Sequence, residues 1–260
     1  MGDRKGLAQC LHNIGFIWSL SGYYSRALIF YNDSLKISKE SGDQWGQANT
    51  LTTIGAVYDV FGEYTKALEH YNKALMIYQK IGDLRGKAIN LNYIGKVYIE
   101  SHDLSKVKEY LEIAEKIAWK IKEKNVLGRI YISFTEFWFL SNDFKKAKRY
   151  SKLSLRIAEE CNSKQGKAEA ILLQARIETA DTRWQIADYR FKEAIKIFEE
   201  LNQPFELAKA YFYYGEMMKI RETWNEKRET EKANRYLKKA KEIFERIGTR
   251  EWLKKFTGGF

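Results

Sequence analysis

The fold is decided by residues 46–85, which read GQANTLTTIGAVYDVFGEYTKALEHYNKALMIYQKIGDLR. The first half places apolar or small residues at steps of three and four, the period of one helix face. These residues are Ala48, Leu51, Ile54, Gly55 and Tyr58, and the second half repeats the pattern with Ala67, Tyr71, Ala74 and Leu75. Gly62 separates the halves, and glycine accepts the left-handed conformation with which helices often end. The stretch therefore predicts two helices joined by a tight turn.

The rest of the chain consists of copies of this unit, each shifted by about forty residues. We divide it into six repeats and a C-terminal cap, namely residues 6–45, 46–85, 86–125, 126–165, 166–205, 206–250 and 251–260. One hairpin cannot bury its apolar face alone, so neighbouring hairpins must stack to form a core.

The last repeat departs from the pattern. Its inter-helix turn is lengthened around Thr223–Glu231 by a charged insert, which we interpret as a solvated helix extension or a mobile loop. After the repeat, Trp252, Leu253 and Phe256 are expected to fold back over the last hairpin.

The N-terminus matches the end of a repeat. Residues 1–6 read MGDRKG and align with residues 81–86, IGDLRG, so the chain begins within the pattern and without a polar capping helix. We therefore expect the sequence to be a fragment of a longer chain. We also expect the uncapped N-terminal end to be available for self-association.

Composition narrows the class of protein. The chain of 260 residues is 45% hydrophobic and 30% charged and has one proline, which suits an all-helical protein with a sizeable core. No stretch approaches the roughly 18–20 apolar residues of a membrane span, and no signal peptide is visible, so no membrane partner is expected. Cys10 and Cys161 form neither a disulfide framework nor a metal motif. We interpret both as packing residues in a reducing cytosol, which predicts a cytoplasmic protein.

The net charge of +11 is unevenly distributed. Residues 1–100 contain 11 basic and 9 acidic side chains, a net charge of +2, and the remaining residues carry +9. Two interpretations stay open: a solvated face of mixed charge, or a basic surface that attracts an acidic partner. Basic runs such as Lys145–Arg149 fit an exposed helix face around Ala147, so nucleic acid is not expected as a partner.

The sequence contains no recognisable catalytic, metal-binding or cofactor-binding motif. The three histidines are His12, His70 and His102, and none has a second ligand at helical spacing. There is no phosphate-binding Gly-x-x-x-x-Gly-Lys-Ser/Thr loop and no Gly-x-Ser-x-Gly elbow. We therefore expect no enzyme activity, no cofactor and no metal.

The repeated pattern resembles the tetratricopeptide repeat (TPR), in the forty-residue variety found in spindle-orientation adaptors and in the sensor regions of microbial signalling proteins. The resemblance is carried by Leu51, Gly55, Tyr58, Ala67, Tyr71, Ala74 and the connector Gly82-Asp83-x-x-Gly86. It implies an all-α fold, namely a right-handed superhelical solenoid of about six helix-turn-helix repeats whose first helices line a concave face. It also implies a binding scaffold.

Each first helix carries a second stripe of side chains that the hairpin core does not need, and the resemblance places this stripe in the concave groove. Amides there can pair with a peptide backbone, aromatic rings can anchor apolar side chains, and Lys or Arg can hold carboxylates. The candidate peptide-binding residues are Gln9, His12, Asn13, Phe16, Asn49, Thr52, Thr53, Asp59, Asn92, Tyr93, Lys96, Arg129 and Arg176. The alternative is that some of them pack between neighbouring hairpins or face water.

The sequence thus predicts a non-catalytic scaffold that binds a peptide segment of a partner protein, with acidic segments among the candidate ligands. One alternative is a regulatory sensor arm of a larger signalling protein with an ATPase, cyclase, kinase or transcription-regulator domain. Another is a self-associating module.

Overall fold

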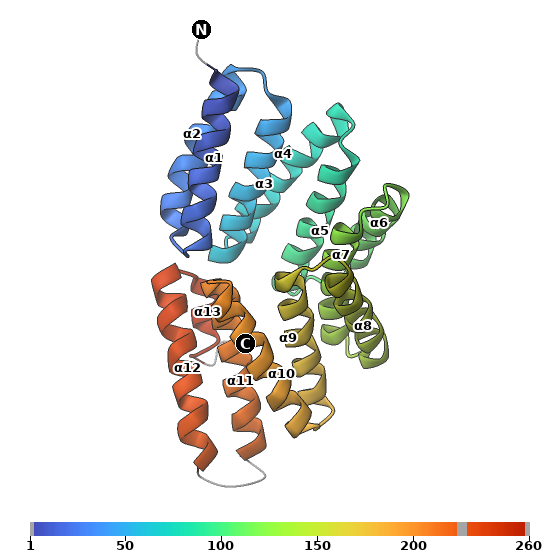
Figure 1. Ribbon diagram of the computed structural model, residues 1–260, viewed down its shortest axis with the longest axis vertical. Coiled ribbons are helices and arrows are strands. Elements are labelled where there is room, and N and C mark those ends of the chain that lie inside the picture. Colours follow the sequence, from blue (N-terminus) through green and yellow to red (C-terminus); the bar gives the residue numbers. More distant parts are fainter. Residues whose placement is uncertain (1–2, 223–227, 258–260) are drawn as a thin grey trace. The chain divides into compact units, whose positions relative to one another are not determined.

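A computed structural model of the protein describes residues 3–222 and 228–257, and every regular element within them is a helix. The helices are α1 (Arg4–Leu20), α2 (Tyr24–Glu40), α3 (Gln44–Phe61), α4 (Tyr64–Ile81), α5 (Leu84–Glu100), α6 (Val107–Lys120), α7 (Lys124–Leu140), α8 (Phe144–Glu160), α9 (Lys164–Ala180), α10 (Trp184–Glu200), α11 (Pro204–Glu222), α12 (Arg228–Ile247) and α13 (Arg250–Lys254). Consecutive helices pair as antiparallel hairpins, from α1/α2 to α11/α12 (Figure 1). The predicted all-helical repeat fold is confirmed.

The hairpin α3/α4 shows how small and large residues combine in the core. Ala48, Ala67 and Tyr71 are fully buried, as the helical period predicts. A Cβ atom added to Gly55 would lie 2.8 Å from the ring of Tyr71, so glycine at this position allows the tyrosine to pack against the backbone of α3.

The tight turns use the left-handed backbone conformation that was predicted for them. Gly62 and Gly82 have φ angles of 77° and 74°, and Asn142 has a φ of 58°. Five further non-glycine residues among those described adopt the left-handed conformation, namely His102, Lys122, Asn162, Thr182 and Asn202. The position in the repeat therefore fixes the turn, and glycine is its least strained occupant.

The connector motif Asp-x-x-Gly starts the first helices of the early repeats. The carboxylate of Asp83 accepts a hydrogen bond from the backbone N–H of Gly86 at 2.8 Å, which caps α5. The corresponding residues cap α1 and α3, with Asp3 bonded to Gly6 and Asp43 bonded to Gly46.

The helix contacts divide the chain into two compact units, Met1–Ser133 and Phe134–Phe260, with the division inside α7. In the first unit, α3 contacts α1, α2, α4 and α5. Its core includes a cluster in which Ile94 of α5 packs with Tyr71 of α4. In the second unit, α9 contacts α8, α10 and α11, and α11 also contacts α12. In both units, first helices therefore contact first helices of neighbouring hairpins.

The second unit ends in an aromatic cluster around α13. Trp252 is 3% exposed and stacks on Phe244 with 5.0 Å between ring centroids. Phe256 contacts Phe212 at 5.2 Å. The predicted insert of the last repeat lies partly outside the described residues, because residues 223–227 are not described, whereas residues 228–231 form the first turn of α12.

Two predictions about α1 are wrong. Ile14 stands in the first repeat where the second repeat has Ile54, so the repeated pattern predicts that it packs in the hairpin core. It is 40% exposed instead, because no described helix packs on this face of α1 in the way that α2 packs on α3. The equivalent residue on α3, Ile54, is 1% exposed. Cys10, expected to be a packing residue, is exposed on α1, and Cys161 is half-buried at the end of α8.

Candidate functional site

The predicted binding residues lie along the first helices, and all but Arg176 belong to the first unit. They are Gln9, His12, Asn13 and Phe16 on α1, Asn49, Thr52, Thr53 and Asp59 on α3, Asn92, Tyr93 and Lys96 on α5, and Arg129 on α7. Arg176 lies on α9 in the second unit and is described separately.

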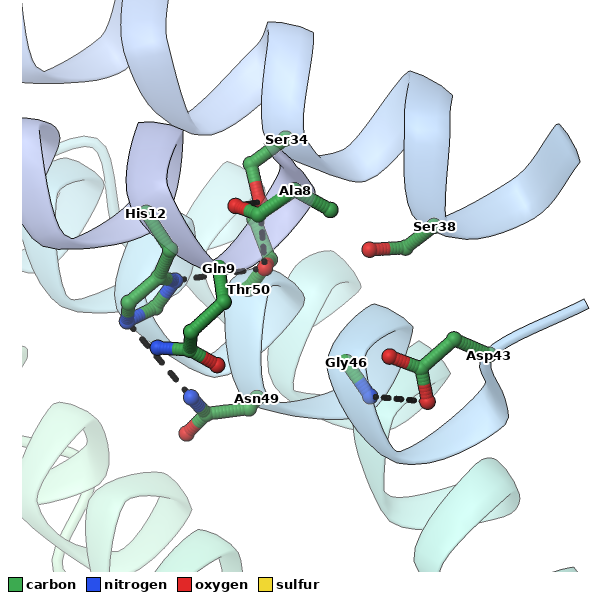
Figure 2. Close-up of a pocket in the computed structure, with 9 residues that line it drawn as sticks. All are labelled: Ala8, Gln9, His12, Ser34, Ser38, Asp43, Gly46, Asn49 and Thr50. Atoms are coloured by element: carbon green, nitrogen blue, oxygen red, sulfur yellow. Dashed lines mark hydrogen bonds between the residues drawn. The ribbon is translucent and has the colours of Figure 1, made fainter. Parts of the chain in front are cut away.

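His12 is the centre of a hydrogen-bonded group that joins α1 to α3 (Figure 2). Its Nδ1 lies 3.3 Å from Oγ1 of Thr50, and its Nε2 lies 3.5 Å from Nδ2 of Asn49. On the other side, the hydroxyl groups of Thr50 and Ser34 lie 3.4 Å apart, and Ser34 donates to the carbonyl oxygen of Ala8 at 2.7 Å. These residues line a polar pocket of about 10 Å³, the size of a single water molecule.

One arrangement of protons satisfies this whole group. An amide nitrogen can only donate, so Asn49 donates to Nε2 of His12. The imidazole must then carry its proton on Nδ1 and donate to Thr50, and Thr50 donates in turn to Ser34. The neutral form of His12 with the proton on Nδ1 is therefore the form that fits its surroundings.

Burial favours the same neutral form. His12 is 8% exposed, and desolvation of its imidazolium lowers the pKa of His12 below its usual value. The ring of Tyr31 lies 5.2 Å from the imidazole ring, and burial raises the pKa of Tyr31 to about 12. The centre of the group is thus uncharged near neutral pH.

A second bridge of the same kind joins α3 to α5. Nδ2 of Asn90 donates to Oγ1 of Thr52 at 2.6 Å, and Thr52 donates to the carbonyl oxygen of Ala48 at 2.9 Å. His12 and Thr50 are 38 residues apart, and so are Thr52 and Asn90. The repeat therefore places equivalent polar pairs between successive first helices, and part of the predicted binding stripe serves as inter-hairpin contact.

Further predicted binding residues lie on α5 and α7. Tyr93 stacks on Tyr71 at 5.3 Å with parallel rings, and Nη1 of Arg129 donates to the hydroxyl of Tyr93 at 3.3 Å. Asn92 is 7% exposed, and its Oδ1 accepts no hydrogen bond from the part of the chain that the structure describes. Thr53 donates to the backbone carbonyl of Thr50 at 2.9 Å.

Several of the predicted residues are open to a ligand. Gln9, Asn13 and Phe16 are exposed on α1, and the side chain of Phe16 is 50% exposed. Nε2 of Gln9 donates to Oδ1 of Asn13 at 2.9 Å, which leaves the amide nitrogen of Asn13 oriented away from Gln9. The remaining residues Asn49, Asp59 and Lys96 are half-buried.

In the second unit, Arg176 forms a buried ion pair. Its Nη1 donates to Oε1 of Glu136 at 2.9 Å, and the two side chains are 9% and 11% exposed. The guanidinium lies over the ring of Tyr213 at 4.0 Å and over that of Phe139 at 4.8 Å. These contacts join α7, α9 and α11, so Arg176 is held by charge and by aromatic faces together.

Of the residues bonded around His12, the sequence singled out Asn49 as a site residue but not Thr50 or Ser34. Ser34 lies on the second helix of the hairpin, and Thr50 belongs to the stripe of α3 that faces α2. The recurrent spacing of 38 residues between polar positions was a usable signal, because it is the repeat length shortened by half a helical turn.

A comparison with protein families matches residues 46–118 to the tetratricopeptide repeat. No curated protein sequence matches the chain significantly. Among solved structures, the Rap conjugation gene regulator of plasmid pLS20, in complex with the Phr* peptide, aligns with 100% of the chain at 15% identity and a TM-score of 0.77. Aspartyl phosphate phosphatase F from Bacillus subtilis aligns with 94% of the chain at 13% identity and a TM-score of 0.72.

A third similar structure is a signal transduction ATPase with numerous domains that carries a tetratricopeptide repeat sensor, from Pyrococcus horikoshii, with 16% identity and a TM-score of 0.61 over 97% of the chain. The chain spans 66%, 61% and 36% of the lengths of these three proteins, in the order given. At such identities the likeness concerns the fold. Together with the match of residues 46–118, this likeness of fold supports a helical repeat protein of the tetratricopeptide type.

Among the described helices, none is long and apolar enough to cross a membrane.

Proposed function

We propose that the chain is a non-catalytic binding module that holds a peptide segment of a partner protein along α1 and α3. The observation that carries this proposal is the orientation of Asn49. Its amide nitrogen is held by His12, and its oxygen points away from the imidazole (Figure 2). A half-buried amide oxygen fixed in this way is preorganised to accept a hydrogen bond from a peptide N–H.

The neighbouring side chains add an apolar anchor and further polar groups. Phe16 follows Asn13 by one helical turn on α1 and exposes half of its surface. An exposed aromatic ring beside amide groups is typical of surfaces that bind peptides. The Rap regulator of similar fold was solved with a bound peptide, which supports a peptide as the ligand class.

The test is to select peptides from a displayed random library on the wild-type protein and to measure their Kd by fluorescence anisotropy. We expect the double variant Asn13→Ala/Asn49→Ala to weaken binding about tenfold or more, because each lost hydrogen bond contributes about 0.5–1.5 kcal/mol. The matched control is Asn32→Ala/Asn72→Ala, which removes two exposed amides from α2 and α4. Equal affinities of wild type and both variants would refute the proposal.

A sensor arm in a larger signalling protein is the second candidate, and the similarity to the sensor-bearing ATPase favours it. In this case a selected peptide changes the activity of an effector domain joined to the chain. The measurement is effector activity in the full-length protein with and without the peptide. A peptide that binds the repeats and leaves the effector unchanged would contradict this candidate.

The exposed face of α1 favours self-association as a further property. Ile14 and Ile17 are 40% and 62% exposed, whereas Ile54 and Val57, their counterparts on α3, are 1% and 2% exposed. Together with Leu7 they form an uncharged apolar stripe, which a second copy of the chain can cover with its own α1.

Light scattering over a range of concentrations tests this property. We expect the mass of the wild type to rise with concentration and that of Ile14→Ser/Ile17→Ser to remain monomeric. Met76→Ser, which changes a residue 70% exposed on α4, is the control and should behave as wild type. A wild-type mass that stays monomeric at all concentrations would exclude self-association through this stripe.

A further inference from the structure

The second unit contains a cleft that none of the predicted binding residues lines. It lies between α10, α11 and α12 and has a volume of about 560 Å³. Tyr214 and Met218 of α11 belong to its lining, and both are buried. Tyr236 of α12 packs against Tyr214 with 4.7 Å between ring centroids. The apolar part of the cleft is therefore built from a methionine and two tyrosines.

The α12 side of the cleft is a stripe of positive charge. Lys232, Arg235 and Lys239 follow one another at steps of three and four and thus lie on one helix face. Within the described residues, none of the three forms an ion pair. Lys239 lies over the ring of Tyr211 at 5.1 Å. No ion pair within the described part of the chain therefore compensates the charges of the stripe.

The chain itself shows that this charge is not a requirement of the hairpin. On α4, the positions that correspond to the stripe are Lys66, Glu69 and Lys73. There Lys73 pairs with Glu69 at 2.5 Å, and Lys66 pairs with Glu63. Arg235 stands where α4 has Glu69, so the internal ion pair of α4 is replaced on α12 by a third cation.

The carboxylate of Asp188, which belongs to the described lining of the cleft, does not neutralise the stripe. Asp188 of α10 accepts a hydrogen bond from the hydroxyl of Tyr214 at 2.5 Å and pairs with Lys192 of the same helix at 2.7 Å. Its charge is therefore matched within α10. The described lining of the cleft therefore carries more basic than acidic side chains, which gives the cleft a positive field.

We infer that this cleft binds an acidic helical segment of a partner protein. The three cations extend over about 10 Å of α12, at 1.5 Å per residue, which exceeds a single phosphate group. A partner helix with carboxylates at i, i+3 and i+7 presents charges at the same spacing. An apolar side chain on the same helix can insert toward Met218, because methionine adapts to varied shapes.

The site uses other helices and other chemistry than the peptide site proposed on α1 and α3, so it goes beyond the proposed function. Attraction by exposed cations is screened by salt, which predicts binding that weakens as ionic strength rises. An acidic helix that carries an apolar residue would retain part of its affinity in salt through the contact with Met218 and Tyr236.

The experiment uses a labelled synthetic peptide of about four helical turns, with Glu at i, i+3 and i+7 and Leu beside them. Fluorescence anisotropy measures its Kd with the full chain. We expect the peptide to bind the wild type and the same peptide with Gln for Glu not to bind. Lys232→Glu/Arg235→Glu should weaken binding about tenfold or more, because two attractions become repulsions.

The matched control is Lys238→Glu/Lys241→Glu, which makes the same change in net charge at exposed positions of α12 outside the cleft. It should bind as wild type, and melting curves by circular dichroism confirm that both variants fold. If the cleft variant Lys232→Glu/Arg235→Glu fails to fold, Lys232→Gln/Arg235→Gln takes its place. Asn13→Ala/Asn49→Ala should bind the acidic peptide normally, which separates this site from the proposed one.

Three results would overturn the inference. Equal weakening in the cleft variant and its control would show a general charge effect. Equal binding of the Glu and Gln peptides would show that carboxylates are not recognised. Binding of ATP at the cleft, lost in the cleft variant, without binding of the acidic peptide would show a phosphate site.

Discussion

Tyr71 and Tyr31 occupy equivalent positions in neighbouring hairpins but differ in the hydrogen bonding of their hydroxyl groups. Tyr71 is fully buried, and its hydroxyl has no hydrogen-bond partner in the described part of the chain. The hydroxyl of Tyr31 interacts with Ser19. An unpaired buried hydroxyl costs free energy, so we expect Tyr71→Phe to raise the free energy of unfolding by about 1 kcal/mol. Tyr31→Phe, measured by the same urea titration, should lower it, and a loss of stability in both variants would contradict the expectation.

His12 gives the protein a pH-dependent contribution to stability. Burial lowers its pKa in the folded state, so below about pH 6.5 the unfolded chain binds a proton that the folded chain resists. The contribution of His12 is therefore intact above that pH and is lost as the pH falls toward the lowered folded-state value. The groups that face it are Tyr31, Asn49, Thr50 and, across the small pocket, Asp43.

Urea titrations at about pH 7.5 and about pH 5.5 test this on either side of the usual histidine pKa. The wild type should lose more stability between the two than His12→Gln, because the variant has no imidazole to protonate. Protonation also turns Nε2 into a donor that faces the donor of Asn49, so peptide binding at Asn49 should weaken at the lower pH. Identical pH dependence of the wild type and the variant would show that protonation of His12 is not coupled to folding.

At the scale of the helix, some first helices leave little room for a side chain at their third residue, which is a glycine in α5 and in α9. A Cβ on Gly86 would lie 2.3 Å from the ring of Tyr78, whereas a Cβ on Gly166 of α9 would meet the side chain of Ser163 at 3.1 Å. Ala has a higher helix propensity than Gly by about 1 kcal/mol. We expect Gly86→Ala to destabilise the protein by about 1–3 kcal/mol through overpacking and Gly166→Ala to cost clearly less. Thermal denaturation measures both, and a larger cost at Gly166 would contradict the packing argument.

The same scale shows what the sequence could and could not predict. Ala48, Leu51 and Ile54 are buried as their period requires, and Gly62 ends α3 in the left-handed conformation. These features depend on one helix and its own turn. The bond between Thr52 and Asn90 depends instead on the register of two hairpins, and the sequence does not state which polar atoms meet across them.

Ile14 shows the same limit from the opposite side. Its apolar character and spacing are those of Ile54 and Ile94, which are 1% and 0% exposed. Whether such a residue is buried depends on the helix that covers it, because Ile94 packs against Tyr71 of α4 whereas Ile14 meets no equivalent helix among the described residues. A repeat pattern therefore predicts the face of each helix, and its neighbours decide the burial.

At the scale of the molecule, the main helix contacts within each unit join helices that are close in the chain. Stability in such an array is a sum of local terms, so a destabilising substitution at one end should mainly affect the hairpins at that end. The aromatic cluster of α13 tests this, because Trp252 contacts Phe205, Phe212 and Phe244 of the last hairpin.

We expect Trp252→Ala to remove about 3–5 kcal/mol of local stabilisation from the last hairpin, because it deletes a buried indole and leaves a cavity among aromatic rings. Hydrogen exchange measured by mass spectrometry should show lost protection in α11 and α12 and unchanged protection in α3 and α4. Trp45→Ala, at a position 50% exposed on α3, is the matched control and should leave both regions protected. If protection falls equally in all hairpins, the array unfolds as one cooperative body and stability is shared along the whole chain.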